Sequence, residues 1–259
     1  MPLIKTSSYK PPVFFRNRHV NTIIHALFRK VHVTYKRERL HTPDEDFVDL
    51  DFSSCESSKV EKPKVILLLL HGLEGSAQSS YIKGMVRSAN DQGWDAAALN
   101  FRGCSGEDNL RIGSYHSGKT EDIQLVVNYL KHTCAYQTIF AVGYSLGANA
   151  LLKYLGETKG ESQVNAAVAL SVPCDLSACA GQLNKWYNSI YRHAFLRTLR
   201  KKVRLKSVLF SKEKINFRAA LKAKTFQEFD NEFTAPANGF KDASAYWDQS
   251  SCLPYLMQI

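Results

Sequence analysis

Four short apolar runs alternate with amphipathic segments between Val65 and Val172, and this alternation strongly constrains the fold. The first run, "VILLLL" (65–70), is apolar on both faces, as a strand buried in a parallel sheet must be. The later runs are "WDAAALNF" (94–101), "TIFAVG" (138–143) and "VNAAVALSV" (164–172). The segments 79–93, 119–133 and 145–157 between them have helical periodicity. This pattern predicts an α/β fold, a mostly parallel sheet with helices on both faces.

The flanking regions predict a division of the chain into four parts. Residues 1–35 form a basic, aromatic arm with a short amphipathic helix in "HVNTIIHALFRKV". Residues 36–175 form the α/β core, and residues 176–246 form a helical, basic cap without a buried strand. Residues 247–259 begin the return to the core.

The acidic stretch "TPDEDFVDLDF" predicts a turn followed by a strand. Val48, Leu50 and Phe52 face one side of this strand, and Asp49 and Asp51 face the other. The stretch lacks the glycine and the terminal glutamate of a calcium-binding loop. We therefore predict a solvated hairpin and no metal site here.

The composition is that of an ordinary globular protein of 259 residues. The six cysteines have no metal-ligand spacing, which favours reduced thiols. The N-terminal segment "MPLIKTSSYKPP" lacks the apolar core of a signal peptide. The longest apolar run, 65–70, is far shorter than the ~20 residues that span a bilayer. These features predict a soluble, cytoplasmic protein, and they do not set its oligomeric state.

The net charge of +10 is concentrated in the predicted cap. Thirteen Lys or Arg residues lie between Lys185 and Lys224, against one acid, Glu213. One interpretation is the solvated faces of amphipathic helices. The other is a cap that faces an anionic substrate or associates weakly with a membrane surface. Because no nucleic-acid-binding module accompanies the charge, we expect no nucleic-acid partner.

The motif "GYSLG" (143–147) places Ser145 between a predicted strand and a predicted helix. In this context Gly-x-Ser-x-Gly is typical of a nucleophile elbow, a turn that exposes the serine hydroxyl. The turn is so sharp that side chains two positions before and two positions after the serine would clash. The alternative is a serine that only caps the helix.

A second motif, "HGLEGS" (71–76), follows the first buried strand. A loop at this place supplies one backbone N–H of an oxyanion hole, and the residue after the nucleophile supplies the other. The predicted donors are the N–H groups of Leu73 and Leu146. His71 is expected to hold the loop by hydrogen bonds rather than to act as a base.

These motifs, in this order, resemble the α/β-hydrolase fold and, within it, the YheT-like branch of carboxylesterases. The stretches that carry the resemblance cover most of residues 15 to 185: "RNRHVNTI", "PDEDFVDLDF", "LLLHGLEGSAQSSYI", "LNFRGCSGEDN", "YHSGKTEDI", "GYSLGANALLKYLGE" and "VPCDLSACAGQL". The resemblance implies a serine hydrolase that cleaves carboxylic esters, short-chain or lipid, through a Ser-Asp-His triad. It also implies an inserted helical cap, no cofactor and no metal.

The acid and base of that triad have no counterpart in this chain. The family carries them after two later strands, whereas this sequence ends at "SSCLPYLMQI". Two residues stand in the right order to replace them, Asp175 and His193, although His193 falls in a predicted cap helix. His116 matches a family position and is expected to order its loop.

We therefore interpret the chain as a truncated form of an active hydrolase, with low activity of its own. The strand "VNAAVALSV" supports this interpretation, because without further strands it would form a bare apolar edge. One alternative is a catalytically inactive hydrolase fold that binds a lipid or a partner protein. Another is an acyltransferase, since the same acyl-enzyme can react with an alcohol instead of water.

Overall fold

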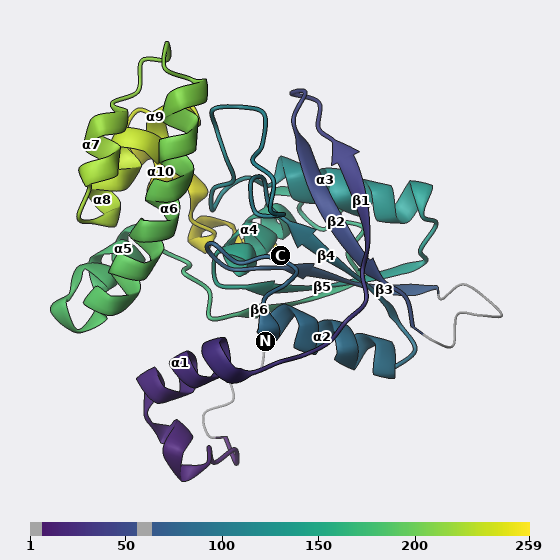
Figure 1. The fold of residues 1–259 in the computed structure, drawn as a ribbon. Coiled ribbons are helices and arrows are strands. Elements are labelled where there is room, and N and C mark those ends of the chain that lie inside the picture. The colour runs from purple at the N-terminus through teal and green to yellow at the C-terminus, as the bar shows by residue number, and fades with distance from the viewer. Residues whose placement is uncertain (1–6, 56–63) are drawn as a thin grey trace.

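The computed structural model describes residues 7–55 and 64–259, and a six-stranded sheet forms its centre (Figure 1). The strand order is β1-β2-β4-β3-β5-β6. The strands are β1 (Lys36–His41), β2 (Phe47–Ser53), β3 (Val65–Leu70), β4 (Asp95–Asn100), β5 (Thr138–Tyr144) and β6 (Ala166–Leu170). β3 to β6 are mutually parallel, and β1 and β2 extend the sheet in antiparallel register. The predicted α/β fold with a mostly parallel sheet is confirmed.

Helices cover both faces of the sheet. On one face, α2 (Ser80–Asp91) packs Ile82 and Val86 against alternate residues of β3 and β4. On the other face, α3 (Glu121–Asn128) and α4 (Leu146–Glu157) cover the larger apolar core. Because side chains of a strand point alternately to its two faces, a run such as 65–70 must be apolar throughout.

The strand β1 was not among the predicted elements, because its sequence, KRERLH, is mostly charged. Its pairing with β2 places Arg37 opposite Asp51 and Arg39 opposite Asp49. Both pairs are bidentate, with N–O distances of 2.6 to 2.9 Å. Cross-strand ion pairs thus replace the apolar contacts that ordinarily identify a strand.

The prediction that the acidic stretch is a solvated hairpin was wrong. Three of its carboxylates are buried, those of Asp46, Asp49 and Asp51. Each faces a guanidinium group, from Arg102, Arg39 and Arg37 respectively. Burial of a carboxylate is tolerable when a charged partner and hydrogen bonds replace its water. The stretch is a turn and a strand, as predicted, but its acids belong to the interior.

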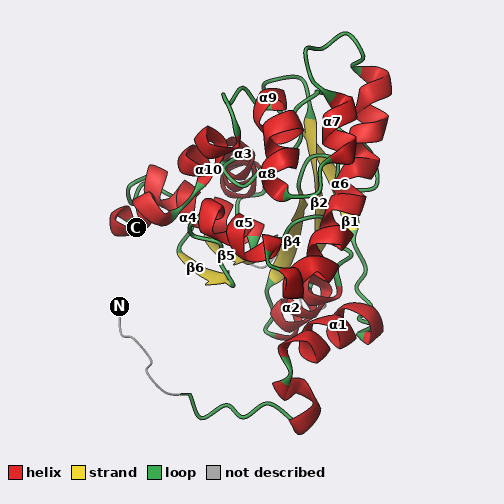
Figure 2. Ribbon diagram, turned by 90° about the vertical axis from the view of Figure 1, so that its left-hand side faces the viewer, coloured by secondary structure: helices red, strands yellow, loops and turns green. Residues whose placement is uncertain are grey.

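The predicted N-terminal helix is present as α1 (Arg18–Phe28), and residues 1–6 of the arm lie outside the described residues. The segment after β6 contains α5 (Leu176–Asn184), α6 (Ser189–Leu209), α7 (Phe217–Lys222), α8 (Phe226–Phe229), α9 (Ala235–Ala237) and α10 (Ala243–Ser250). We call the segment 176–250 the cap; it is four residues longer than the predicted cap, 176–246, because α10 continues to Ser250. It stands to one side of the sheet (Figures 1 and 2) and contains two apolar clusters of its own. A 3-10 segment, Leu253–Gln258, follows it.

β6 forms the outer edge of the sheet within the described part of the chain. It pairs with β5, and no described strand pairs with its other side. Val168 and Leu170 are exposed by 54% and 37%. An apolar strand with an open edge is a feature that folded proteins generally avoid.

None of the helices within residues 7–55 and 64–259 combines the length and apolar character needed to cross a lipid bilayer.

Candidate active site

Ser145 lies at the turn between β5 and α4. Its backbone angles are φ 50° and ψ −116°, which a residue with a Cβ adopts only at a cost of about 1–3 kcal/mol. The Ser145 N–H donates to the carbonyl oxygen of Leu170 at 2.9 Å, and this bond fixes the turn to β6. The Ser145 side chain makes no capping hydrogen bond to α4. The helix-capping interpretation therefore lacks its defining contact.

The two glycines of the motif are required by close backbone contacts. A Cβ at Gly143 would lie 2.6 Å from the Cα of Ala148. A Cβ at Gly147 would lie 2.5 Å from the carbonyl oxygen of His71. Both distances are far below van der Waals contact, and the neighbouring atoms belong to the backbone. The glycines thus permit the tight turn that presents Ser145.

The "HGLEGS" loop lies directly against Ser145. An ideal Cβ on Gly72 would come within 3.3 Å of the Ser145 Cβ. The loop is held by its neighbours: the Gly72 N–H donates to the Tyr81 hydroxyl at 3.0 Å, and the Glu74 N–H to the Tyr115 hydroxyl at 2.8 Å. Glu74 itself has a positive φ of 56°. The loop therefore has a fixed conformation beside the serine.

The backbone N–H groups of Leu73 and Leu146 lack the hydrogen-bond acceptors that their neighbours have within the described residues. The Leu73 N–H donates to no acceptor within the described residues, although those of Gly72, Glu74 and Gly75 do. Leu146 begins α4, so its N–H has no partner within the helix. Both residues line the same cavity as Ser145. Two such amides in one cavity with a serine are candidates for the donors of an oxyanion hole.

The two histidines nearest this site are committed to structural hydrogen bonds. His71 is fully buried; its Nδ1 bonds the Gly72 carbonyl oxygen at 2.7 Å, and its Nε2 accepts from the Phe101 N–H at 3.2 Å. His116 accepts the Gly118 N–H at Nδ1, so its neutral ring carries the proton on Nε2. Burial lowers the pKa of His71 to about 4 and that of His116 to about 3. Neither ring is suited to accept a proton from Ser145 near neutral pH.

Asp175 and His193, the two stand-ins for the triad, do not line the cavity that contains Ser145. Asp175 is exposed, and its carboxylate caps α5 by accepting the Ala178 N–H at 2.9 Å. His193 is exposed on α6, and its Nδ1 bonds the carbonyl oxygen of Ser189 in the same helix at 2.6 Å. The structure does not bring these two residues together with Ser145.

The cavity has a volume of about 260 Å³ and lies between the core and the cap. The core contributes Leu73, Ser145, Leu146 and His116 to its wall. The cap contributes mainly apolar side chains, including Leu176, Leu183, Phe195, Leu199, Phe226 and Phe229. The mainly apolar wall of this cavity suits a substrate with a hydrophobic part.

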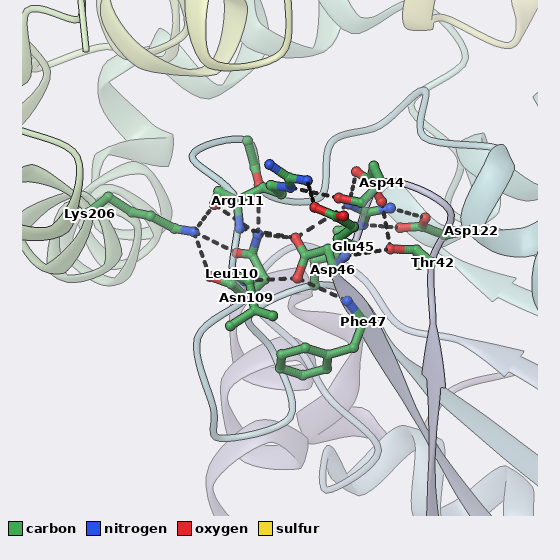
Figure 3. A network of polar contacts seen from close by, with 12 residues as sticks. Thr42, Asp44, Glu45, Asp46, Phe47, Asn109, Leu110, Arg111, Asp122 and Lys206 are labelled. Carbon is green, nitrogen blue, oxygen red and sulfur yellow. Dashed lines mark hydrogen bonds and ion pairs between the residues drawn. The ribbon is translucent and has the colours of Figure 1, made fainter. Parts of the chain in front are cut away.

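Two lysines of α6, Lys202 and Lys206, bond the cap to the core. Nothing in the sequence pattern distinguished them from the other basic residues among the thirteen. Lys202 bonds the Glu74 carboxylate at 2.7 Å and the Cys104 sulfur at 3.2 Å. Lys206 is buried and bonds Oδ1 and the carbonyl oxygen of Asn109 at 2.8 and 3.0 Å (Figure 3). Burial lowers the pKa of Lys206 to about 8. These lysines lie one helical turn apart and face inward, so only part of the basic charge is solvated.

Asp230 is a buried acid in the cavity wall, and it should make the stability of the protein depend on pH. Burial raises its pKa to about 6, although Trp247 Nε1 donates to it at 2.9 Å. The contribution of Asp230 to the free energy of unfolding is fully present below pH ~4 and is lost as the pH rises through about 6. Asp230→Asn should therefore stabilise the protein at pH 8 by about 2–3 kcal/mol and change little at pH 4, as measured by urea unfolding.

The matched control for this experiment is Asp248→Asn, which alters an exposed carboxylate beside Trp247. As a substitution at the surface, it should change the free energy of unfolding by no more than about 0.5 kcal/mol at pH 8. Equal effects of Asp230→Asn at pH 4 and pH 8 would show that the buried carboxyl group does not titrate in this range.

The family assignment follows from comparison with known proteins. Residues 65–259 match the family model of the alpha/beta hydrolase fold. The chain belongs to the α/β-hydrolase family. This α/β hydrolase is 36% identical to the Escherichia coli protein described as putative esterase YheT, over 256 residues that cover 98% of this chain and 75% of that protein. The predicted resemblance to the YheT-like branch is thereby confirmed.

Two further relatives bear the names of lipid-cleaving enzymes. Human phospholipase ABHD3 is 29% identical over 99% of this chain and 64% of its own length. A monoacylglycerol lipase of Saccharomyces cerevisiae is 30% identical over 73% of this chain and 43% of its own length. The α/β hydrolase thus spans only part of each of these proteins.

A solved structure shows the same fold. The esterase Pf2001 of Pyrococcus furiosus superposes with a TM-score of 0.50 at 19% identity, over 64% of this chain and 61% of its own.

Proposed function

We propose that this protein is a carboxylic-ester hydrolase in which Ser145 forms an acyl-enzyme. The observation that carries the proposal is the strained Ser145 beside two backbone donors, Leu73 and Leu146, in one apolar cavity. The relatives named esterase, lipase and phospholipase favour the same chemistry. Because these names cover different substrates, they do not identify the acyl chain or the alcohol of the substrate.

In the proposed reaction, the Ser145 hydroxyl attacks the ester carbonyl carbon while a base takes its proton. The carbonyl oxygen becomes an oxyanion, which accepts hydrogen bonds from the Leu73 and Leu146 N–H groups. As this intermediate collapses, the base gives the proton to the leaving oxygen, the bond from the carbonyl carbon to that oxygen breaks, and the alcohol departs while the acyl group stays on Ser145. Water then attacks the acyl-enzyme by the same route and releases the carboxylic acid.

We further propose that the base and its acid follow Ile259 in the natural protein. Three observations support this. His71 and His116 are committed to the structure. His193 is exposed outside the cavity. The outer edge of β6 is open to a further strand within the described residues.

A fluorophosphonate probe tests the proposal directly, because it forms a covalent adduct much faster with an activated serine than with other hydroxyl groups. The chain extended through its natural downstream sequence should become labelled, with the adduct located on Ser145 by peptide mass spectrometry. The 259-residue chain should react at least about 1,000-fold more slowly, because it lacks the base. Ser145→Ala is the control for labelling elsewhere.

Two outcomes would contradict the proposal in different ways. Failure of the extended chain to react would favour a hydrolase fold that binds without cleaving. Rapid labelling of the 259-residue chain would show that the base lies within it, and Asp175 and His193 would then be the first residues to replace.

A further inference from the structure

The outward face of α6 has an unusual composition for a solvent-exposed helix. Three apolar residues on it are widely exposed: Ile190 by 71%, Leu205 by 47% and Val208 by 75%. Arg197, Lys201 and Arg204 are exposed among them, and Trp186, just before the helix, is exposed by 83%. The helix contains no aspartate or glutamate. We call these seven residues the α6 outer face.

The α6 outer face is a continuous stripe rather than scattered residues. Positions 190, 197, 201, 204, 205 and 208 recur at helical spacing, so their side chains project from one side. The other side of α6 is used within the molecule: Leu196 and Val203 are buried in the cap, and Phe195, Leu199 and Lys202 line the cavity. Within the described part of the chain, nothing covers the outward stripe.

We propose that the α6 outer face docks on the surface of an anionic lipid bilayer. Apolar side chains interleaved with Lys and Arg are the composition of helices that lie in a membrane interface. Trp186 strengthens the inference, because tryptophan favours the boundary between lipid and water. The absence of acids on α6 gives the face a single sign of charge, complementary to anionic headgroups.

The same charge argues against the other occupants of an apolar face. In a symmetric dimer the same patch meets itself, so Arg197, Lys201 and Arg204 of two copies would repel. A nucleic acid would match the charge, but it offers no apolar surface to Ile190, Leu205 and Val208. An anionic bilayer offers negative headgroups to the basic side chains of the α6 outer face and hydrocarbon to its apolar side chains.

If the α6 outer face lies on the lipid, the cavity that contains Ser145 is close to the bilayer, because only the width of α6 lies between them. The proposal does not depend on the esterase assignment, because vesicle binding is measured without turnover. Lipid binding and ester hydrolysis can therefore fail independently.

Sedimentation with vesicles tests the proposal. The protein should bind vesicles of phosphatidylcholine with 30% phosphatidylglycerol and bind pure phosphatidylcholine vesicles far more weakly. The triple variant Arg197→Gln, Lys201→Gln, Arg204→Gln should lose about 100-fold in partitioning to the anionic vesicles. The triple variant Trp186→Ser, Ile190→Ser, Val208→Ser should lose about tenfold or more.

Two matched controls separate the face from general effects of charge and hydrophobicity. Lys64→Gln, Arg87→Gln, Lys159→Gln removes three exposed positive charges outside the cap. Leu110→Ser removes an apolar side chain that is 59% exposed on a core loop. Both controls should bind anionic vesicles within about twofold of the unmodified protein, apart from a small long-range effect of net charge.

Tryptophan fluorescence gives a second, local measurement. Trp186 is highly exposed, whereas Trp247 is buried and Trp94 is partly buried. Anionic vesicles should shift the emission to shorter wavelength, and Trp186→Phe should abolish that shift while sedimentation persists.

The proposal would be overturned by no binding to anionic vesicles, by binding that neither triple variant weakens, or by equal binding to neutral vesicles. A dimer in light scattering that either triple variant dissociates would identify a second copy of the chain as the occupant. Binding of duplex DNA without binding of vesicles would also overturn it.

Discussion

Replacing Ser145 with glycine is expected to abolish ester hydrolysis and to yield a more stable protein than replacing it with alanine. Both variants remove the nucleophile, so the rate of the extended chain should fall by on the order of 10⁴-fold or more. The stabilities should differ because Ser145 has a φ of 50° and ψ of −116°. Alanine retains the Cβ that makes this conformation costly, whereas glycine has none.

The expected difference is about 1 kcal/mol in the free energy of unfolding, with Ser145→Gly above Ser145→Ala. It is smaller than the backbone strain, because glycine also gains conformational freedom in the unfolded chain. Urea unfolding of the two variants measures it, and hydrolysis of a chromogenic ester measures the rate. A glycine variant less stable than the alanine variant would show that the turn stores no strain at Ser145.

The control position is Asn149, which follows Ser145 by one turn of α4 in ordinary helical conformation. Its side chain bonds the carbonyl oxygens of Ser117 and Ser250. Both Asn149→Ala and Asn149→Gly lose these bonds, and here the glycine variant should be the less stable by about 1 kcal/mol. The reversed order of glycine and alanine at the two positions is the decisive comparison.

The second large effect is expected from Arg102→Ala, which should destabilise the protein by about 3–5 kcal/mol at pH 7. The Arg102 side chain is only 4% exposed. Its Nε and Nη2 hold both oxygens of Asp122, at 2.8 and 2.6 Å, and its Nη1 bonds Asp44 at 2.6 Å and Asp46 at 3.4 Å. Asp46 and Asp122 are buried, so removal of Arg102 leaves two buried carboxylates without the guanidinium group that faces them.

The destabilisation should depend on pH in a defined direction. The hydrogen bond from Arg102 holds the pKa of Asp44 well below its usual range, and this contribution is present above pH ~4 and lost as the pH falls. Without Arg102 the buried carboxyl groups retain protons more readily. The deficit of Arg102→Ala should therefore be largest near pH 7. It should shrink toward pH 4 as the buried groups of the variant take up protons, and further below pH 4 as the Asp44 contribution is lost, as measured by urea unfolding from pH 7 to pH 3.

Arg111→Ala is the matched control, because Arg111 also pairs with an acid of this stretch, Glu45, but at the surface. Exposed ion pairs contribute at most about 1 kcal/mol, so this variant should show a small effect. Arg102→Lys keeps the charge but cannot hold Asp122 in bidentate fashion, and it should fall between the two. An Arg102→Ala variant as stable as Arg111→Ala would contradict the structural role given to the buried pairs.

Much of the fold followed from short-range patterns. The run 65–70 is apolar on both faces, and it forms the central strand β3 over the same residues. The strands near 95, 138 and 166 and the helices between them also lie where periodicity predicted them. Such patterns can be interpreted from sequence because burial on one or both faces repeats every two or 3.6 residues.

One element of the fold and one feature of the site could not be predicted in this way. The charged strand β1 is held in the sheet by ion pairs of Arg37 and Arg39 with the aspartates of β2. The inward contacts of Lys202 and Lys206 were hidden among thirteen basic residues of the cap. In both cases, the partner lies far away in the sequence or on another element, and composition does not reveal it.

The sequence by itself determined the conformation at Ser145, because a Cβ at Gly143 or Gly147 would lie only 2.6 or 2.5 Å from atoms of the backbone. That requirement is local and steric. Only the tertiary structure decided the surroundings of the serine: His71 and His116 are committed to backbone hydrogen bonds, and Asp175 and His193 lie outside the cavity. Distances between side chains depend on how whole elements pack, and packing joins residues that no local pattern connects.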